Sequence, residues 1–287
     1  MTRVPNPERR VVFISGASSG IGNACAAFLA KRGCAVYGTS RDPDRVERRA
    51  DEFFSLIRMD LEDDGSVAEA VRLVGEKEGR IDFLLCNAGL GVAGPALETP
   101  LDQARRQLEV NVIGALKLMQ AALPYLRRSE RPRIALMGSI AGRIGLPFQG
   151  LYSASKFALE GLAEALRMEL SVEGIELSII EPGDFRSGFT AARARFGADE
   201  GSPYAEAARA ALLKAEADER GGAHPIEIAK LVYGLILSRR LRPRYTVGNA
   251  AQRFAALIRR AVPDRWFERL IMANYGVVPG ARRRGRG

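Results

Sequence analysis

Residues 10–22 read RVVFISGASSGIG, and this stretch decides the fold. Its β-branched first half predicts a buried strand, and the apolar periodicity that follows, up to Gly33, predicts a helix ended by a glycine. Between the two, Gly16, Gly20 and Gly22 lack Cβ atoms. The backbone there can approach a pyrophosphate, whose charge the first amides of the helix would bind. Many loops carry three glycines, but the strand before these and the helix after them favour a nucleotide-binding turn.

Strands and helices alternate along the rest of the chain. Helices are predicted at 64–79 and 101–127 and from 151 onward, together with a polar helix before residue 53. Short apolar runs predict six further strands, at 35–40, 53–59, 81–85, 134–137, 176–181 and 245–248. This order indicates an α/β protein with one Rossmann-like, doubly wound parallel sheet of about seven strands and helices on both faces.

Composition excludes several classes of protein. Three cysteines without C-x-x-C spacing predict a reduced, cytoplasmic protein that has no structural disulfide or zinc site. A single histidine, His224, argues against a histidine metal cluster, and we expect no metal. No apolar run is long enough to span a bilayer, and residues 1–10 do not resemble a signal peptide.

The positive charge is concentrated at the C-terminal end. The chain carries a net charge of +9, and from Arg239 onward there are thirteen arginines against two acidic residues. Residues 250–275 also carry apolar side chains at helical spacing, so 250–287 is predicted to be a helical extension with a disordered basic tail, Arg282–Gly287. Its helices would either cap the substrate cleft or rest on anionic lipid as a peripheral membrane contact. No nucleic-acid-binding motif accompanies the charge.

Tyr152 and Lys156 stand four residues apart at the start of a predicted helix, on one face. A nearby ammonium favours the phenolate and would move the tyrosine pKa from about 10 toward neutrality. The pair therefore suggests acid–base chemistry, although an ordinary amphipathic helix could carry both residues. The predicted strand 35–40 ends at Ser40-Arg41, where NAD-binding sheets place an acidic residue. Arg41 would bind a 2′-phosphate unless it pairs with Asp42, which favours NADP(H) over NAD(H).

From Val11 to Gly248 the chain resembles the short-chain dehydrogenases/reductases. Three sets of residues carry the resemblance. Ser15-Gly16-x-x-x-Gly20-x-Gly22 is similar to the family's T-G-x-x-x-G-x-G, and Asn87-Ala88-Gly89 to its N-N-A-G, with Cys86 replacing the first asparagine. The catalytic tetrad positions hold Asn111, Ser139, Tyr152 and Lys156.

The resemblance implies a role for each of these residues. Tyr152 would be the general acid or base, Lys156 would lower its pKa and bind the nicotinamide ribose, and Ser139 would polarise the substrate carbonyl. Asn111 would hold a proton-supplying water chain. The implied cofactor-binding residues are Gly16, Ser18, Ser19, Gly20, Ile21 and Gly22 at the phosphates, Arg41, Asp60 and Leu61 at the adenosine, Asn87, Ala88 and Gly89, and Pro182, Gly183 and Ser187.

The resemblance also implies a domain plan and an activity. Residues 1–249 would be the catalytic domain with a substrate lid at about 185–222, and its aromatic residues suggest a hydrophobic substrate. The activity would be NADP(H)-dependent interconversion of a ketone or aldehyde and an alcohol, most like the 17β-hydroxysteroid and retinol dehydrogenases. A 3-oxoacyl reductase and a non-catalytic NADP-binding sensor or scaffold remain alternatives. The helices at 101–127 and 151–172 would pair two copies into a homodimer, and the extension would block a tetramer.

Overall fold

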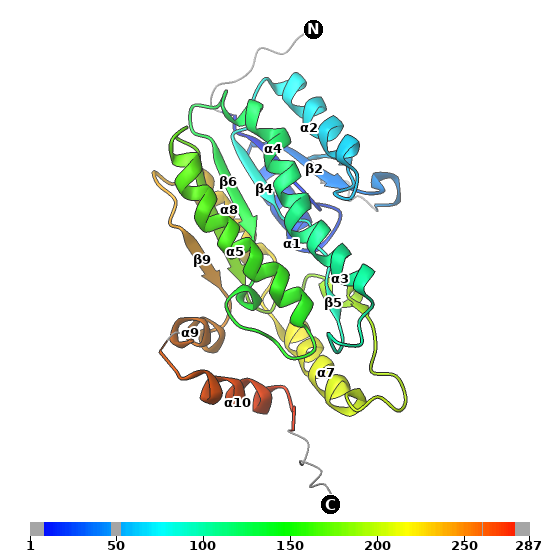
Figure 1. The fold of residues 1–287 in the computed structure, drawn as a ribbon. Coiled ribbons are helices and arrows are strands. Elements are labelled where there is room, and N and C mark those ends of the chain that lie inside the picture. The colour runs from blue at the N-terminus through cyan, green and yellow to red at the C-terminus, as the bar shows by residue number, and fades with distance from the viewer. Residues whose placement is uncertain (1–8, 47–52, 260, 279–287) are drawn as a thin grey trace, which may run out of the picture.

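The computed structural model describes residues 9–46, 53–259 and 261–278, built around a seven-stranded sheet (Figure 1). Every neighbouring pair of strands in this sheet is parallel. The strand order is β3 (Ser55–Arg58), β2 (Ala35–Ser40), β1 (Val11–Ile14), β4 (Phe83–Cys86), β6 (Arg133–Met137), β7 (Glu176–Pro182) and β9 (Arg244–Val247). The predicted doubly wound sheet of seven strands is confirmed.

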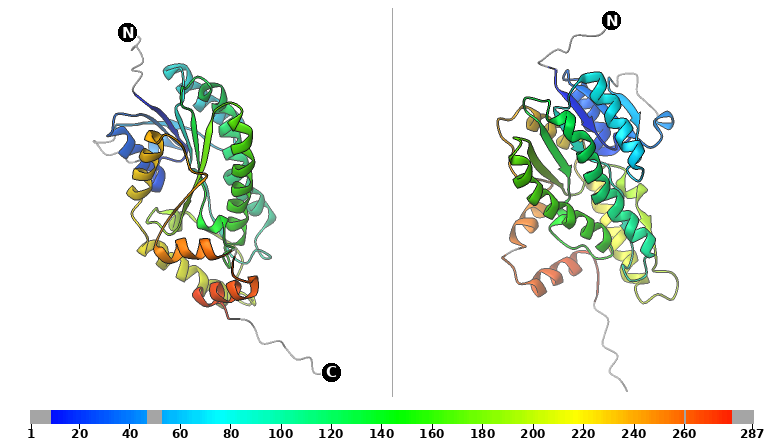
Figure 2. Two further views of the ribbon diagram at one scale, coloured as in Figure 1. Left: turned by 90° about the vertical axis from the view of Figure 1, so that its left-hand side faces the viewer. Right: turned by 45° about the horizontal axis from the view of Figure 1, so that its top comes forward.

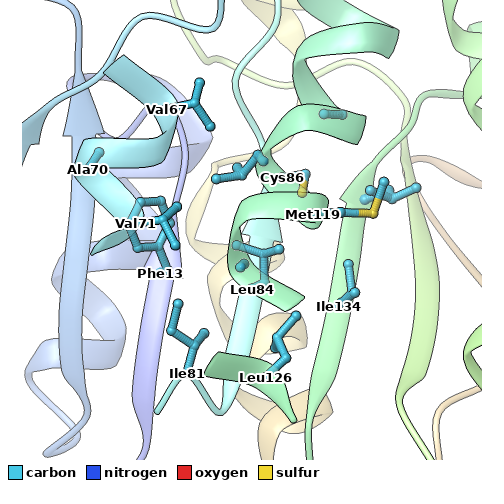
Figure 3. Packing of buried hydrophobic residues seen from close by; sticks show 14 of the residues in the cluster. Phe13, Val67, Ala70, Val71, Ile81, Leu84, Cys86, Met119, Leu126 and Ile134 are labelled. Atoms are coloured by element: carbon cyan, nitrogen blue, oxygen red, sulfur yellow. The ribbon is translucent and has the colours of Figure 1, made fainter. Parts of the chain in front are cut away.

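Helices cover both faces of the sheet, as the left view of Figure 2 shows. One face carries α2 (Asp64–Glu78), α4 (Gly114–Leu126) and α5 (Gly150–Ser171), and the other carries α1 (Gly20–Ala30) and α8 (Ile226–Leu237). Strands buried on both faces must be apolar throughout, which is why β1 and β4 read as continuous apolar runs. Figure 3 shows Phe13, Leu84 and Ile134 of the sheet beneath Val71 of α2 and Leu126 of α4.

The strand order reverses between β1 and β4, because successive strands are added on opposite sides of this pair. Open parallel sheets bind their ligands at such a point, outside the carboxyl ends of the strands. The elements at this edge are α3 (Leu101–Leu108), α6 (Phe189–Ala192), α7 (Ala205–Gly221), the 3-10 turn η3 (Ile140–Gly142) and a small sheet of β5 (Val92–Ala93) and β8 (Ala194–Arg195).

Two predicted helices differ from the structure. The helix expected at 101–127 is divided by a π-helical turn, η2 (Glu109–Ile113), where the buried Asn111 side chain bonds to groups outside its own helix. A π-helical turn forms its hydrogen bonds between residues five apart instead of four, and it usually occurs as a single turn inside an α-helix. Instead of a polar helix before β3, the described residues form only a 3-10 turn, η1 (Pro43–Arg45), ended by the extended Val46. The remainder of that predicted helix, 47–52, lies outside the described residues.

The C-terminal extension contains two helices, α9 (Ala250–Ile258) and α10 (Asp264–Asn274), with Pro263 just before α10. Both lie below the carboxyl edge of the sheet (Figures 1 and 2). The inward face of α10 places Phe267 against Ile140 and Ile144. The predicted tail, Arg282–Gly287, lies outside the described residues. Within the described ranges, no helix has both the length and the apolar character needed to cross a bilayer.

Candidate active site

A cleft of about 1160 Å³ opens at the carboxyl edge of the sheet. The reversal of strand order between β1 and β4 predicts a ligand site at this edge. Of the predicted site residues, all except Gly22 and Asn111 line this cleft. They are Gly16, Ser18, Ser19, Gly20, Ile21, Arg41, Asp60, Leu61, Asn87, Ala88, Gly89, Ser139, Tyr152, Lys156, Pro182, Gly183 and Ser187. The fold therefore brings together residues that are up to 171 positions apart in the sequence, from Gly16 to Ser187.

The glycine turn between β1 and α1 has backbone angles and close contacts that favour glycine. Gly16 and Gly20 have φ angles of 68° and 57°, which residues with a side chain rarely adopt. A Cβ on Gly20 would collide with the backbone oxygen of Ser187, and one on Gly22 with that of Gly16. Gly22 therefore packs against the backbone of the turn and does not line the cleft. The first turn of α1 carries no acidic residue, so its amides present positive charge to the cleft.

The segment after β4 braces this turn. The Asn87 side-chain amide donates to the backbone oxygens of Ser15 and Gly16, each at 3.0 Å. In return, Ser15 Oγ accepts the backbone N–H groups of Asn87 at 2.9 Å and Ala88 at 3.0 Å. Ser15, which replaces the family's usual threonine, thus keeps the hydroxyl that this brace needs.

At the end of the cleft beside β2, Arg41 is exposed and Asp42 does not neutralise it. The Asp42 carboxylate instead pairs with Arg45 at 2.9 Å. Among the described residues, Arg41 forms no ion pair. The same part of the cleft contains Arg106, held by Glu62 in a two-pronged contact at 3.0 and 2.9 Å. Sequence reasoning missed this pair, because nothing in the pattern links residues 44 positions apart.

Tyr152 and Lys156 point into the cleft from the first turns of α5. Lys156 Nζ donates to the Met137 carbonyl oxygen at 2.8 Å and lies 5.7 Å from the centre of the Tyr152 ring. Burial lowers the pKa of Lys156 to about 8. Burial also raises the pKa of Tyr152 to about 12, more than its hydrogen bond with Ser139 lowers it. Ser139 and, after it, the charge of Arg193 are the neighbours that lower the tyrosine pKa.

Asn111 does not reach the cleft. Its side chain is 2% exposed and is fully engaged by the protein. Oδ1 accepts the Leu90 N–H at 2.8 Å, and Nδ2 donates to the Leu90 oxygen and to Ser155 Oγ, both at 3.0 Å. Ser155 belongs to the same helix as Tyr152 and Lys156. Asn111 therefore ties the segment after Gly89 to the catalytic helix.

The end of the cleft beyond Tyr152 mixes apolar and acidic groups. Phe189 packs on Tyr152 with ring centres 5.4 Å apart, and Ile271 of α10 lines the same space. Three carboxylates that sequence reasoning missed also line it: Asp184, Asp218 and Glu219. The one available signal was the position of Asp184, directly after the predicted Pro182-Gly183 pair.

Comparison with known proteins identifies relatives over most of the chain. The family model described as short chain dehydrogenase matches residues 10–196. A 3-ketodihydrosphingosine reductase from Bacteroides thetaiotaomicron is 33% identical, over 94% of this chain and 99% of that protein. The 17-beta-hydroxysteroid dehydrogenase type 1 of Homo sapiens is 41% identical over 63% of this chain and 58% of that protein.

Solved structures show the same fold with either cofactor. An alcohol dehydrogenase from the archaeon Thermococcus sibiricus, complexed with 5-hydroxy-NADP, is 26% identical with a TM-score of 0.69, over 85% of this chain and 97% of that one. A short chain dehydrogenase/reductase from Burkholderia phymatum in complex with NAD is 25% identical with a TM-score of 0.75, over 88% and 93%.

Proposed function

Because the chain belongs to the short-chain dehydrogenase family, and is thus an oxidoreductase that uses a nicotinamide cofactor, we propose that it interconverts a hydrophobic ketone and its alcohol with NADP(H). One observation carries this proposal. The glycine turn and the side chains of Ser139, Tyr152 and Lys156 line one continuous cleft. A sensor or scaffold would need the turn but not the tyrosine and lysine that line the cleft.

The chain's own residues would bind and orient the reactants and move one proton. Gly16, Ser19 and Gly20 would hold the pyrophosphate at the start of α1, and the bound nicotinamide would supply the hydride. Ser139 would donate a hydrogen bond to the substrate oxygen, and Tyr152 would give that oxygen its proton. The Lys156 ammonium would favour the tyrosinate left behind. Reduction would thus consume one NADPH and one proton for each alcohol formed.

The residues at the end of β2 support NADP over NAD. A 2′-phosphate needs a cationic donor at this point, and an acidic residue there would repel it. Ser40 is neutral, Arg41 is exposed beside the cleft, and Asp42 is already paired with Arg45. Arg106 supplies a second guanidinium at the same end.

The lining beyond Tyr152 supports a hydrophobic, lipid-like substrate. Ile144, Leu146, Phe189 and Ile271 give this end an apolar wall, and α10 closes it. A steroid-, retinoid- or lipid-like chain would fit such a wall. The name of the Bacteroides thetaiotaomicron relative also refers to a lipid ketone.

Two surfaces support proposals about assembly and location. Leu108, Ile113 and Phe157 are exposed on α3, η2 and α5, which suits the pairing of two copies through these helices into a homodimer. A monomer mass in light scattering would rule out this dimer, and a tetramer would show that the extension does not block further assembly.

The outer face of α9 and α10 exposes Phe254, Trp266 and Leu270, which suits a cytoplasmic protein in peripheral contact with a membrane.

The direct test is NADPH consumption with a panel of hydrophobic ketones, repeated with Tyr152→Phe. This change removes the proton donor and keeps the ring that packs on Phe189. We expect turnover to fall about 100-fold or more, the usual contribution of a positioned acid, while NADPH still binds in calorimetry. A variant with nearly unchanged turnover would show that Tyr152 is not the acid. Failure of the unmodified protein to oxidise NADPH with any ketone would contradict the proposed activity.

A further inference from the structure

We infer that Glu160 and Glu181, two buried glutamates behind the cleft, share one proton and position Ser139 for the reaction. Glu160 lies in α5 and Glu181 near the end of β7, and neither lines the cleft. The inference rests on the proposed reductase function, in which Ser139 bonds to the ketone oxygen. Both glutamates would act only through the turn that carries Ser139.

The carboxyl groups of these two glutamates meet at one guanidinium group. Glu160 is 7% exposed and Glu181 is fully buried. Arg244 Nε, from β9, donates to Glu160 Oε2 at 2.8 Å and lies 3.7 Å from Glu181 Oε1. Two buried carboxylates this close to each other repel, and a single proton between them removes most of the repulsion.

The hydrogen bonds indicate which of the two glutamates carries the proton. Glu181 has a donor at each oxygen, Arg143 at Oε1 at 3.0 Å and Thr246 at Oε2. Glu160 Oε1, by contrast, is buried without a hydrogen-bond partner among the described residues. A buried carboxylate oxygen without a donor is costly. With a proton, this oxygen becomes a donor, and Glu181 is the acceptor beside it. Glu160 is therefore the acid of the pair and Glu181 the carboxylate.

The other charged groups around Glu160 are consistent with a protonated carboxyl. Arg244 also bonds to Glu164 at 3.1 Å, so its charge is divided between two carboxyl groups. Arg167 lies on the same helix, but its Nη1 is buried without a hydrogen-bond partner in the described ranges. Burial raises the pKa of Glu160, and the charge of Glu181 raises it further, more than the hydrogen bond from Arg244 lowers it.

The Ser139 turn, residues 139–143, is attached to β7 at both ends. At its start, Ser139 Oγ donates to the Pro182 oxygen at 3.5 Å, and at its end Arg143 bonds to Glu181. Glu181 directly precedes Pro182, so both attachments are made to neighbouring residues of one strand. Loss of the negative charge at Glu181 would therefore release the Arg143 end of the turn.

The Ser139 turn also packs against α5 beside Glu160. A Cβ on Gly142 would lie 2.9 Å from the Lys156 backbone oxygen and 3.3 Å from Glu160 Cγ, so the turn and the helix are already in close contact. The same helix carries Tyr152, whose side chain is hydrogen-bonded to Ser139. Negative charge on both glutamates would push α5 away from β7, and with it Tyr152 away from Ser139. The shared proton thus keeps these two side chains within bonding distance.

Substitution by glutamine distinguishes the two glutamates, because an amide resembles a protonated carboxyl group and not a carboxylate. Glu160→Gln should keep kcat for ketone reduction within about 2-fold, whereas Glu181→Gln should lower it roughly 10- to 100-fold, the cost of misplacing a group at the reacting atom. NADPH affinity in calorimetry should change little in either variant, since neither residue lines the cleft. Glu164→Gln is the matched control, an exposed carboxylate bonded to the same Arg244, and should leave kcat unchanged.

Two further measurements detect the proton itself. The infrared spectrum of the unmodified protein minus that of Glu160→Gln should contain the carbonyl band of a protonated carboxylic acid at neutral pH. Unfolding in urea gives the second. Because the pKa of Glu160 is raised, the folded protein keeps a proton that the unfolded chain releases above the ordinary value of 4.5. The urea midpoint of the unmodified protein, relative to that of Glu160→Gln, should therefore fall as pH rises above this value.

A difference spectrum without the acid band, or equal losses of kcat in the two glutamine variants, would overturn the shared proton and leave the proposed function standing. An unchanged kcat in Glu181→Gln would overturn the positioning of Ser139. If Glu181→Gln does not fold, Arg143→Gln removes the same attachment from a partly exposed side chain, and it should lower kcat as well. An unchanged kcat in that variant would count equally against the inference.

If the unmodified protein reduces no ketone, the proposed function fails, and crystal structures of the variants decide the inference separately. The distance from Ser139 Oγ to the Tyr152 hydroxyl should lengthen in Glu181→Gln and stay the same in Glu160→Gln. The same distance in both variants would refute the positioning role of the pair.

Discussion

Asn111→Leu should destabilise the protein by about 2 to 4 kcal/mol, and the structure shows where this cost arises. The change removes three hydrogen bonds from a buried site. Two of the three partners keep another bond, because the Leu90 oxygen also accepts from Gln107 at 2.7 Å, and Ser155 Oγ also donates to the Tyr152 oxygen at 2.7 Å. Within the described ranges, the Leu90 N–H bonds only to Asn111, so the change leaves it unsatisfied. That single orphaned donor accounts for about 1 to 3 kcal/mol of the total.

Urea unfolding at a fixed protein concentration measures this loss, as the midpoint shift multiplied by the slope m. Gln120→Leu is the matched control, since Gln120 is exposed on α4, and it should change stability by about 0.5 kcal/mol or less. A loss below about 1 kcal/mol for Asn111→Leu would show that the Leu90 N–H finds another partner. The reasoning from the unsatisfied donor would then be refuted.

Three further outcomes are expected. Arg41→Ala should remove most of an NADPH-over-NADH preference in calorimetric titration, because the exposed guanidinium is the predicted 2′-phosphate donor; equal affinities in the unmodified protein would contradict that role. Reduction should slow as pH rises through about 8, because burial lowers the pKa of Lys156 to about 8 and the ammonium is charged only below it; a kcat/KM profile flat from pH 7 to 9 would contradict a requirement for the charge. The protein should sediment with phosphatidylglycerol vesicles more than with phosphatidylcholine vesicles, and Trp266→Ala combined with Leu270→Ser should weaken that binding by roughly 10-fold or more. Equal sedimentation with both lipids would argue against an anionic membrane as the partner.

The sheet was predictable because its strands are buried on both faces. Phe83–Cys86 and Arg133–Met137 are buried at every position, so their apolar runs stand out from the amphipathic helices around them. The interruption at Asn111 was not predictable, since η2 keeps the apolar character of the helix on either side. Only the bonds to Leu90 and Ser155, which come from elsewhere in the chain, distinguish that turn.

The glycine turn at one end of the cleft was predictable, and the charged groups at the other end were not. A backbone turn is built by one continuous stretch, so Gly16, Gly20 and Gly22 carry their meaning in their spacing. The groups around Asp184 come from separate elements, with the charged Asp218 and Glu219 in α7 and the neutral Gln252 in α9. Their signs and pairings exist only once these elements pack together. The elevated pKa of Tyr152 likewise follows from burial, which no local pattern reports.

The late position of α10 in the sequence has a consequence for synthesis of the protein. The sheet is complete once β9 has left the ribosome, whereas Ile271, Asn274 and Tyr275 reach the cleft only some 25 residues later. A nascent chain would therefore form its glycine turn before the α10 side of the cleft exists. A polypeptide cut short between β9 and α10 would keep the folded sheet and lose that side of the cleft.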